Sequence, residues 1–177
     1  MPAFVILDRD GVINEDSPNY VKSVDEWIPV PGSLQAIAKL TEAGYKVFIA
    51  TNQAGIGRGK LTLVTLKKIH ERMTNEVERF GGKIEDIQFC PHHPHDKCDC
   101  RKPKPGMLTN LAKAHDLDLT QGYFVGDSLK DLLAAEAAGC TGVLVLSGTG
   151  QRTLKLRPGY KPAHLDLAAF VDSLLAD

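Results

Sequence analysis

Short, almost continuously apolar runs alternate along the chain with longer segments in which apolar residues recur at helical spacing. The first run, Phe4 to Leu7, is typical of a strand buried on both faces. Similar runs predict further strands over residues 45–50, 87–90, 123–125 and 143–146. The segments with helical spacing predict helices over residues 33–43, 62–80, 107–112, 129–135 and 165–175.

This strand–helix alternation predicts an α/β fold, a Rossmann-like parallel sheet with helices on both faces. In such sheets, ligands bind beyond the carboxyl ends of the strands. No repeat, low-complexity tract or linker interrupts the pattern, so we expect a single domain over residues 1–177. The short interval between the first two strands leaves no room for a large cap domain over the site.

The composition narrows the class of partner. The formal net charge of -1 lacks the basic excess typical of nucleic-acid-binding proteins. No apolar run approaches the ~18 residues that a membrane-spanning helix needs, and no basic segment precedes the first run as in a signal peptide. We therefore expect a cytoplasmic monomer that binds a small molecule, and neither nucleic acid nor a membrane.

Acidic side chains follow two of the predicted strands. Asp8 and Asp10 come directly after the first strand, and their spacing of two places them on one face. Asp127 follows the fourth strand, with Asp131 one helical turn further. Because parallel strands end at one rim, these carboxylates would repel one another unless a cation neutralised them, and Mg²⁺ suits such oxygen ligands. The alternative is that each aspartate only caps a turn or a helix.

Two further segments supply groups that suit a phosphate. Thr51 offers a hydroxyl at the start of a glycine-rich stretch, residues 52–59, whose backbone N–H groups could face an anion. Arg101 and Lys102 could offset phosphate charge. Taken separately, these segments would be an ordinary loop and a solvated basic turn. Together with the aspartates, they indicate a phosphate site.

Four segments, in order along the chain, carry a resemblance to a known superfamily. They are residues 8–14, 51–53, 98–107 and 126–131. They resemble the four motifs of the haloacid dehalogenase superfamily, and more closely its heptose bisphosphate phosphatases, in the histidinol-phosphatase-like family. The resemblance implies a phosphoric monoester hydrolase that depends on Mg²⁺ and forms an aspartyl-phosphate.

The resemblance also implies a role for individual residues. It makes Asp8 the nucleophile and Asp10 the general acid and base, and it assigns the phosphoryl group to Thr51 and Lys102. Asp127 would complete the Mg²⁺ site together with Asp8 and Asp10. The positions implied to contact substrate are Asp16, Tyr20, Thr51, Asn52, Gln53, Ala54, Arg101 and Lys102. Whether Ser128 or Asp131 contacts the metal stays open.

Three thiols and an imidazole crowd into one irregular segment. They form the Cys₃His set that tetrahedral zinc takes, and a closed shell of protein ligands indicates a structural site. The spacing is not the usual C-x-x-C, His93 and His95 compete for the nitrogen position, and unmetallated thiols are the alternative. The resemblance favours the set Cys90, His92, Cys98 and Cys100. Crowded thiols also fit a reducing compartment better than a disulfide framework.

The choice of substrate leaves alternatives. The resemblance implies removal of the 7-phosphate of D-glycero-D-manno-heptose 1,7-bisphosphate, on the route to nucleotide-activated heptose for lipopolysaccharide or other glycans. The second phosphate would need further donors, available in Arg58, Gly59 and Arg101. Histidinol phosphate would instead favour acidic or aromatic partners, available in Glu15, Asp16 and Tyr20. A zinc-loop binding module without catalysis is the alternative of another class, and the preferred anomer stays open.

Overall fold

The computed structural model describes residues 3–176, which contain one six-stranded parallel sheet. The order across the sheet is β3-β2-β1-β4-β5-β6. The strands are β1 (Phe4–Leu7), β2 (Lys46–Asn52), β3 (Asp86–Cys90), β4 (Tyr123–Gly126), β5 (Thr141–Val145) and β6 (Ala163–His164). Residues 1, 2 and 177 of the predicted single domain lie outside the described range.

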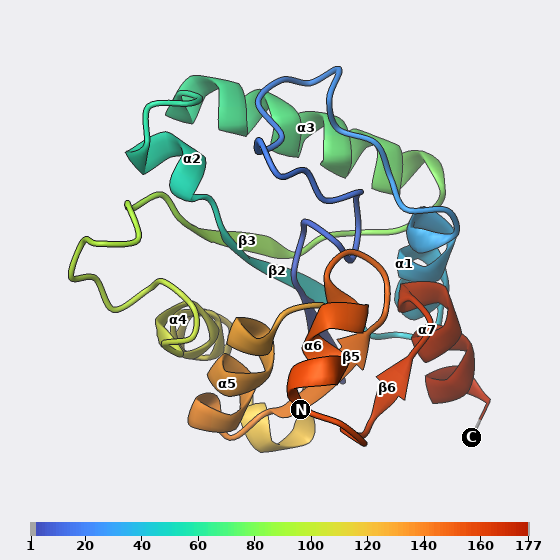
Figure 1. Cartoon of the computed structure of the whole chain (residues 1–177). Coiled ribbons are helices and arrows are strands. Elements are labelled where there is room, and N and C mark those ends of the chain that lie inside the picture. The colour runs from blue at the N-terminus through green and yellow to red at the C-terminus, as the bar shows by residue number, and fades with distance from the viewer. Residues whose placement is uncertain (1–2, 177) are drawn as a thin grey trace.

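Helices cover both faces of this sheet (Figure 1). One face carries α1 (Ser33–Glu42), α3 (Leu63–Arg79) and α7 (Leu167–Leu175), and the other carries α4 (Gly106–His115) and α5 (Leu129–Ala138). The connections hold the short elements α2 (Ala54–Gly57), η1 (Leu119–Gln121) and α6 (Gly150–Leu156). Among the described residues, no helix combines the length and hydropathy needed to span a membrane.

Alternation along the strands builds two separate cores. On β1, Val5 and Leu7 belong to the core beneath α1, α3 and α7, whereas Phe4 and Ile6 belong to the core beneath α4 and α5. Successive side chains of a strand point to opposite faces, so a strand between two helical layers must be apolar throughout. This requirement explains the continuous apolar runs in the sequence.

The predicted α/β fold, with its parallel sheet and its helices on both faces, is confirmed. Each predicted strand and helix is present with small shifts of its ends, as where the strand expected over 143–146 is β5 (Thr141–Val145). The pattern missed β6, which has two residues, and α6, whose only apolar side chains are Leu154 and Leu156. Such short or polar elements produce no periodic signal. Between β1 and α1, residues 8–32 contain turns and isolated bridges, so no cap domain is inserted there.

The strand order places a crevice at the carboxyl ends of the central strands. β1 lies between β2 and β4, and the order of the strands along the chain reverses at this point. Connections after β1 and β4 therefore leave the sheet on different sides and open a space between them. Asp8 follows β1 directly and Asp127 follows β4 directly, so both lie at this crevice.

Candidate active site

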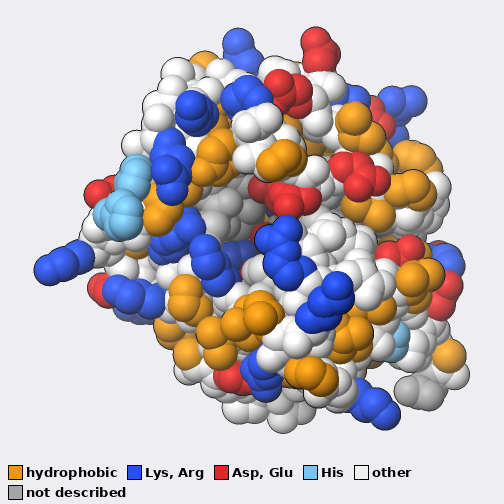
Figure 2. All heavy atoms as spheres, viewed as in Figure 1, with side chains coloured by type: hydrophobic (Ala, Val, Ile, Leu, Met, Phe, Trp, Pro, Cys, Tyr) orange, Lys and Arg blue, Asp and Glu red, His pale blue; other side chains and the backbone are white. Residues whose placement is uncertain are grey.

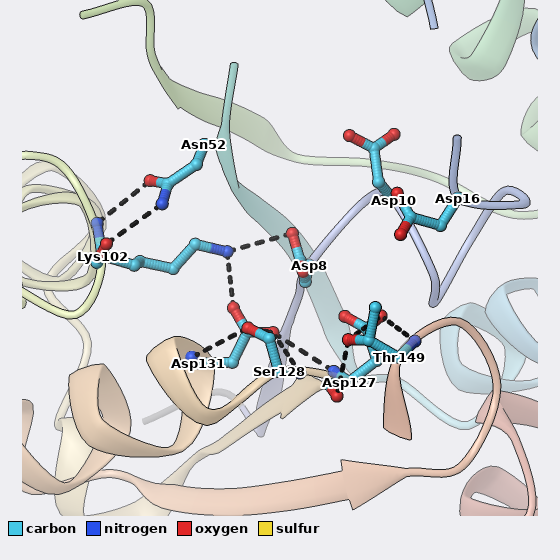
Figure 3. Close-up of a pocket in the computed structure, with 9 residues that line it drawn as sticks. All are labelled: Asp8, Asp10, Asp16, Asn52, Lys102, Asp127, Ser128, Asp131 and Thr149. Atoms are coloured by element: carbon cyan, nitrogen blue, oxygen red, sulfur yellow. Dashed lines mark hydrogen bonds and ion pairs between the residues drawn. The ribbon is translucent and has the colours of Figure 1, made fainter. Parts of the chain in front are cut away.

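A pocket of about 180 Å³ opens in the crevice. Figure 3 shows its side chains converging from the segments after β1, β4 and β5, from the end of β2 and from the loop before α4. In the space-filling view, acidic and basic side chains border a hollow on this face (Figure 2). The residues lining the pocket are Asp8, Asp10, Asp16, Asn52, Lys102, Asp127, Ser128, Asp131 and Thr149.

Three carboxylates meet in this pocket. Oxygen atoms of Asp8, Asp127 and Asp131 all lie within 4.8 Å of one another. Burial, and after it the negative charge of Asp131, raises the pKa of Asp8 well above its ordinary value and the pKa of Asp127 to about 7. Three negative charges are therefore unfavourable here, whereas a hard cation with oxygen ligands would stabilise them. This donor set fits the predicted Mg²⁺.

One positive charge of the chain already lies in the cluster. Lys102 is 2% exposed, and its Nζ lies 3.0 Å from Asp8 Oδ1 and 2.7 Å from Asp131 Oδ1. Burial alone would lower the pKa of Lys102, but the charges of Asp131 and Asp8 raise it above its ordinary value. Asn52 fixes the segment, since the Lys102 N–H donates to Asn52 Oδ1 at 3.0 Å and Asn52 Nδ2 donates to the Lys102 carbonyl at 3.1 Å.

Asp131 holds other parts of the site in place. Its Oδ2 accepts hydrogen bonds from the backbone N–H groups of Asp127 and Ser128, at 3.2 and 3.1 Å, and from the Ser128 hydroxyl at 2.9 Å. Ser128 and Asp131 thereby form a capping box at the start of α5. Because Oδ1 is paired with Lys102, both oxygens of Asp131 are engaged. Asp131 therefore orients Lys102 and the backbone at Asp127.

The carboxylate of Asp10 points away from the other three (Figure 3). Its Oδ1 accepts hydrogen bonds from Arg9 Nε at 2.9 Å, Arg9 Nη2 at 2.7 Å and Asn14 Nδ2 at 2.9 Å. Its Oδ2 accepts one from Gln53 Nε2 at 3.1 Å. Burial alone would raise the pKa of Asp10, but the charge of Arg9 and these hydrogen bonds hold it below its ordinary value. The structure thus separates the Asp10 side chain from the carboxylates that could share a cation.

The predicted zinc ligands come together at the end of β3. The distances from Cys90 Sγ are 3.1 Å to Cys100 Sγ, 3.3 Å to His92 Nδ1 and 3.7 Å to Cys98 Sγ. A tetrahedral zinc site with thiolate ligands has ligand separations of about 3.8 Å, so the cluster is close to that arrangement. The rings of His93 and His95 stack on each other, and the ligand group contains His92 instead. Among the three candidate histidines, His92 is the one that the structure places with the three thiols.

The protonation of these thiols also indicates a cation. Burial, together with the adjacent Cys90 and Cys98 thiols, raises the pKa of Cys100 to about 12. Burial also opposes ionisation of Cys98, yet hydrogen bonds from the Arg101 backbone and its neighbours lower the pKa of Cys98 to about 6. Three adjacent sulfur atoms therefore cannot all ionise unless a metal ion neutralises them.

The chain is similar in sequence and in structure to known proteins. Residues 99–174 match a family model described as HAD-hydrolase-like. A D-glycero-β-D-manno-heptose-1,7-bisphosphate 7-phosphatase of Pseudomonas aeruginosa is 51% identical over 174 residues, which are 98% of each chain. The D,D-heptose 1,7-bisphosphate phosphatase of Bordetella bronchiseptica, whose crystal structure is a complex with magnesium and phosphate, is 48% identical, with a TM-score of 0.94 over 98% of each chain. The chain belongs to the heptose bisphosphate phosphatase family.

Membership of this family confirms the resemblance carried by the four sequence motifs. A further member with a solved structure, from Burkholderia thailandensis, is 39% identical with a TM-score of 0.77 over 99% of each chain. Both structural matches extend over almost the whole chain, and thus over the whole sheet. The fold described above is thus that of a phosphatase family.

The structure distributes the remaining predicted site residues over several positions. Thr51 and Gln53 are buried, and Gln53 Nε2 donates to Thr51 Oγ1 at 3.0 Å, so neither lines the pocket. Asp16 and Asn52 do line it. Tyr20 lines a neighbouring cavity, and Ala54 is buried at the start of α2. Arg101 lines another cavity, which Lys102 also lines.

Sequence analysis missed the segment after β5, which also reaches the pocket. The Thr149 N–H donates to Asp127 Oδ2 at 2.8 Å, and its hydroxyl lies 3.1 Å from the same oxygen. Gly11 and Gly148 both adopt positive φ, and a Cβ on either would overlap the Asp127 carboxylate. The available signal was Gly148 just beyond a predicted strand, at the rim where the other strands end. The segment that holds Asp127 has no acidic or basic side chain there, so the sequence did not indicate its place at the pocket.

Gly11 offers a test of this close packing, with Gly44 as its matched control. Both have φ near +86°, at +86° and +87°, but nothing lies within 4 Å of a Cβ added to Gly44. Gly44→Ala should cost roughly 1 kcal/mol of unfolding free energy from the backbone conformation alone. Gly11→Ala should cost a further 1–3 kcal/mol (roughly) from overpacking, and should displace Asp127 and abolish turnover. Equal losses in denaturant melts would contradict the contact with Asp127.

The cysteine cluster predicts one tightly held zinc ion per chain. Cys98→Ser should lower the zinc content and the melting temperature, because binding to a closed thiolate site contributes directly to folding. Activity should fall too, since the cluster immediately precedes Arg101 and Lys102. Cys140→Ser changes a thiol outside the cluster, whose Sγ donates to the Gly122 carbonyl, and should keep its zinc. Metal analysis and melting curves measure both variants, and a zinc-free protein with unchanged stability would refute the structural role.

Proposed function

We propose that the chain is a magnesium-dependent phosphatase that removes the 7-phosphate of D-glycero-β-D-manno-heptose 1,7-bisphosphate. The observation that carries this proposal is the buried Asp8–Lys102 pair in the crevice where the strand order reverses. The chain around it matches this family over almost its whole length. The β anomer is the one named for the relatives. The product would serve the formation of nucleotide-activated heptose.

The side chains of Asp8 and Asp127 would hold the magnesium ion, with Asp131 beside them. When bound, the ion neutralises the phosphoryl oxygens and the carboxylate cluster. The predicted set included Asp10, whose side chain is engaged by Arg9 instead. We assign the Asp10 side chain to proton transfer. The bound magnesium in the Bordetella relative supports the choice of metal.

Asp8 performs the first displacement. A carboxylate oxygen of Asp8 attacks phosphorus, the bond from phosphorus to the leaving sugar oxygen breaks, and an aspartyl-phosphate forms. Lys102 faces this carboxylate at 3.0 Å, so its charge stabilises the phosphoryl oxygens as the bond forms. Asp131 keeps the ammonium group in place. Water then attacks the aspartyl-phosphate at phosphorus, releases inorganic phosphate and restores Asp8.

Asp10 moves the proton in both displacements. It gives a proton to the leaving alkoxide and later takes one from the attacking water. The low pKa of Asp10 in the free chain comes from Arg9 and the surrounding donors, which outweigh burial. A phosphate dianion in the pocket opposes the charge of Arg9, so substrate binding raises the proton affinity of Asp10. The acid form is then available when the leaving group needs it.

The second phosphate needs a cation outside the catalytic pocket. A neighbouring cavity of about 430 Å³ shares Lys102 with that pocket and is also lined by Arg101, Lys97 and Lys104. Arg101 Nη1 is buried and has no hydrogen-bond partner among the described residues. Arg58, by contrast, is exposed and lines neither cavity. We therefore place the second phosphate against Arg101.

We also propose that the chain works as a single-domain monomer in the cytoplasm. Its cysteines are unpaired among the described residues, and three of them form the metal cluster. Thiolate metal sites of this kind suit a reducing compartment.

The nucleophile is tested by Asp8→Asn. This variant should lose kcat by a factor on the order of 10⁴ or more, because the attacking oxygen becomes an amide. The wild-type chain, quenched in acid during turnover, should carry one phosphoryl group that maps to Asp8 by mass spectrometry. Asp25→Asn, the same change at an exposed site outside the pocket, is the control and should be neutral. Near-normal turnover by Asp8→Asn without deamidation would rule out the covalent mechanism.

The substrate is tested by measuring kcat/KM for four compounds side by side. They are the β and α anomers of the heptose bisphosphate, fructose 1,6-bisphosphate and histidinol phosphate. kcat/KM for the β anomer should exceed that for each of the others by ~100-fold, which corresponds to about 2.7 kcal/mol of differential transition-state binding. If histidinol phosphate leads by that margin, the heptose assignment is lost and the mechanism stands. The exposed Glu15 and Asp16, which line a cavity beside the pocket, would then bind its amine.

A further inference from the structure

A fully buried guanidinium group lies between Asp10 and a histidine of α3. Arg9 is 0% exposed, and its Nε and Nη2 both donate to Asp10 Oδ1. On its other side, Nη1 lies 3.1 Å from Nε2 of His70, a residue of α3 that is 61 positions away in the sequence. The three side chains therefore form a line from the helix, through Arg9, to the acid of the proposed mechanism.

The chemistry of these groups fixes their protonation. A guanidinium group has only donors, so His70 Nε2 must accept the hydrogen bond and carry no proton. The histidine is then the neutral tautomer protonated on Nδ1. Burial, with the charge of Arg9 adding to it, lowers the pKa of His70 to about 3 against the pull of Asp10. His70 is thus a permanent neutral acceptor under physiological conditions.

This acceptor determines how firmly Arg9 can hold Asp10. Two of the three hydrogen bonds to Asp10 Oδ1 come from Arg9, and the third comes from Asn14. Without His70, Nη1 of Arg9 would be a buried donor with no partner, a state that costs about 1–3 kcal/mol. Rotation of the guanidinium group toward another acceptor would relieve this cost and would break the two bonds to Asp10. The orientation of the Asp10 carboxylate therefore depends on a residue that does not touch it.

We propose that His70 is a positioning residue for Asp10, acting through Arg9 to hold the carboxyl group that protonates the leaving oxygen. The inference rests on the proposed function, in which Asp10 is that proton donor. It assigns a catalytic consequence to a buried histidine on the apolar face of α3. A histidine that only fills the core would lower stability without discriminating between leaving groups.

The test compares two kinds of phosphate ester. The heptose bisphosphate has an alkoxide leaving group that needs a proton, whereas p-nitrophenyl phosphate has a leaving group that departs without one. kcat/KM is the quantity to compare, because it covers the steps up to the aspartyl-phosphate and so isolates the acid step. His70→Leu should lower it by about 10–100-fold for the heptose ester, since misplacement of a catalytic group has effects of this size. The aryl ester should change by less than about threefold, because its reaction needs no general acid.

Three further variants make the outcome decisive. His70→Gln can place Oε1 near the position of Nε2 and should restore most of the lost activity. The shorter His70→Asn cannot reach that position. It should show the loss expected for His70→Leu, and it replaces that variant if His70→Leu does not fold. His115→Leu is the matched control: it removes a half-buried histidine whose Nε2 pairs with Asp86 Oδ2 at 2.8 Å, far from the pocket, and should affect both esters equally. Equal losses on the two esters in folded His70 variants would overturn the proposal.

The Asp10→Asn variant separates the two levels of the argument. If Asp10 is the acid, kcat/KM of this variant should fall far more for the heptose ester than for the aryl ester. If Asp10→Asn shows no such difference, the proposed role of Asp10 fails, and the positioning role of His70 fails with it. If Asp10→Asn shows the difference and the His70 variants do not, only the positioning role is refuted.

Discussion

The ion pairs that join Lys102 to Asp8 and Asp131 are the interaction on which the rest of the site depends. A buried ammonium group is tolerated only where opposite charges and hydrogen bonds replace water. Asp8 follows β1, Asp131 lies on α5 and Lys102 lies in the loop before α4. The fold must therefore bring Lys102 Nζ within 3.0 Å of carboxylates on two other segments. Removal of Lys102 would leave the buried carboxylates without an opposite charge, at a cost of about 3–5 kcal/mol.

Much of the surrounding structure serves to fix these three segments. The capping box at the start of α5 orients Asp131, and the side chain of Asn52 binds both the N–H and the carbonyl group of Lys102. The cysteine cluster ends at Cys100, two residues before Lys102, so a zinc ion there would anchor a loop that has no regular secondary structure. A polar, irregular loop otherwise orders poorly, and a bound metal would supply the stability that an apolar core gives elsewhere.

The sequence was sufficient to predict the alternation of strands and helices, the carboxylates at the strand ends and the grouping of Cys90, His92, Cys98 and Cys100. It could not predict the strand order, because a strand that is apolar on both faces does not reveal which strands it pairs with. The shared face expected for Asp8 and Asp10 is a property of regular strands, but β1 ends at Leu7 and Gly11 turns the chain at φ +86°. The contacts of Thr149 and His70 were also beyond prediction, since each depends on how loops and helices meet in three dimensions.

The divergence of Asp8 and Asp10 is what allows two carboxylates so close in sequence to perform different chemistry. Asp8 lies with Asp127 and Asp131, where burial and like charges favour a cation or an electrophilic phosphorus atom. Asp10 lies with Arg9, Asn14 and Gln53, where the surrounding donors hold the pKa of the carboxyl group below its ordinary value. Environments that push two acids in opposite directions are how a site divides nucleophile from proton carrier. The end of β1 at Leu7 allows that division, because outside the regular strand the Asp10 carboxylate faces the buried guanidinium group of Arg9 while the Asp8 carboxylate faces Lys102.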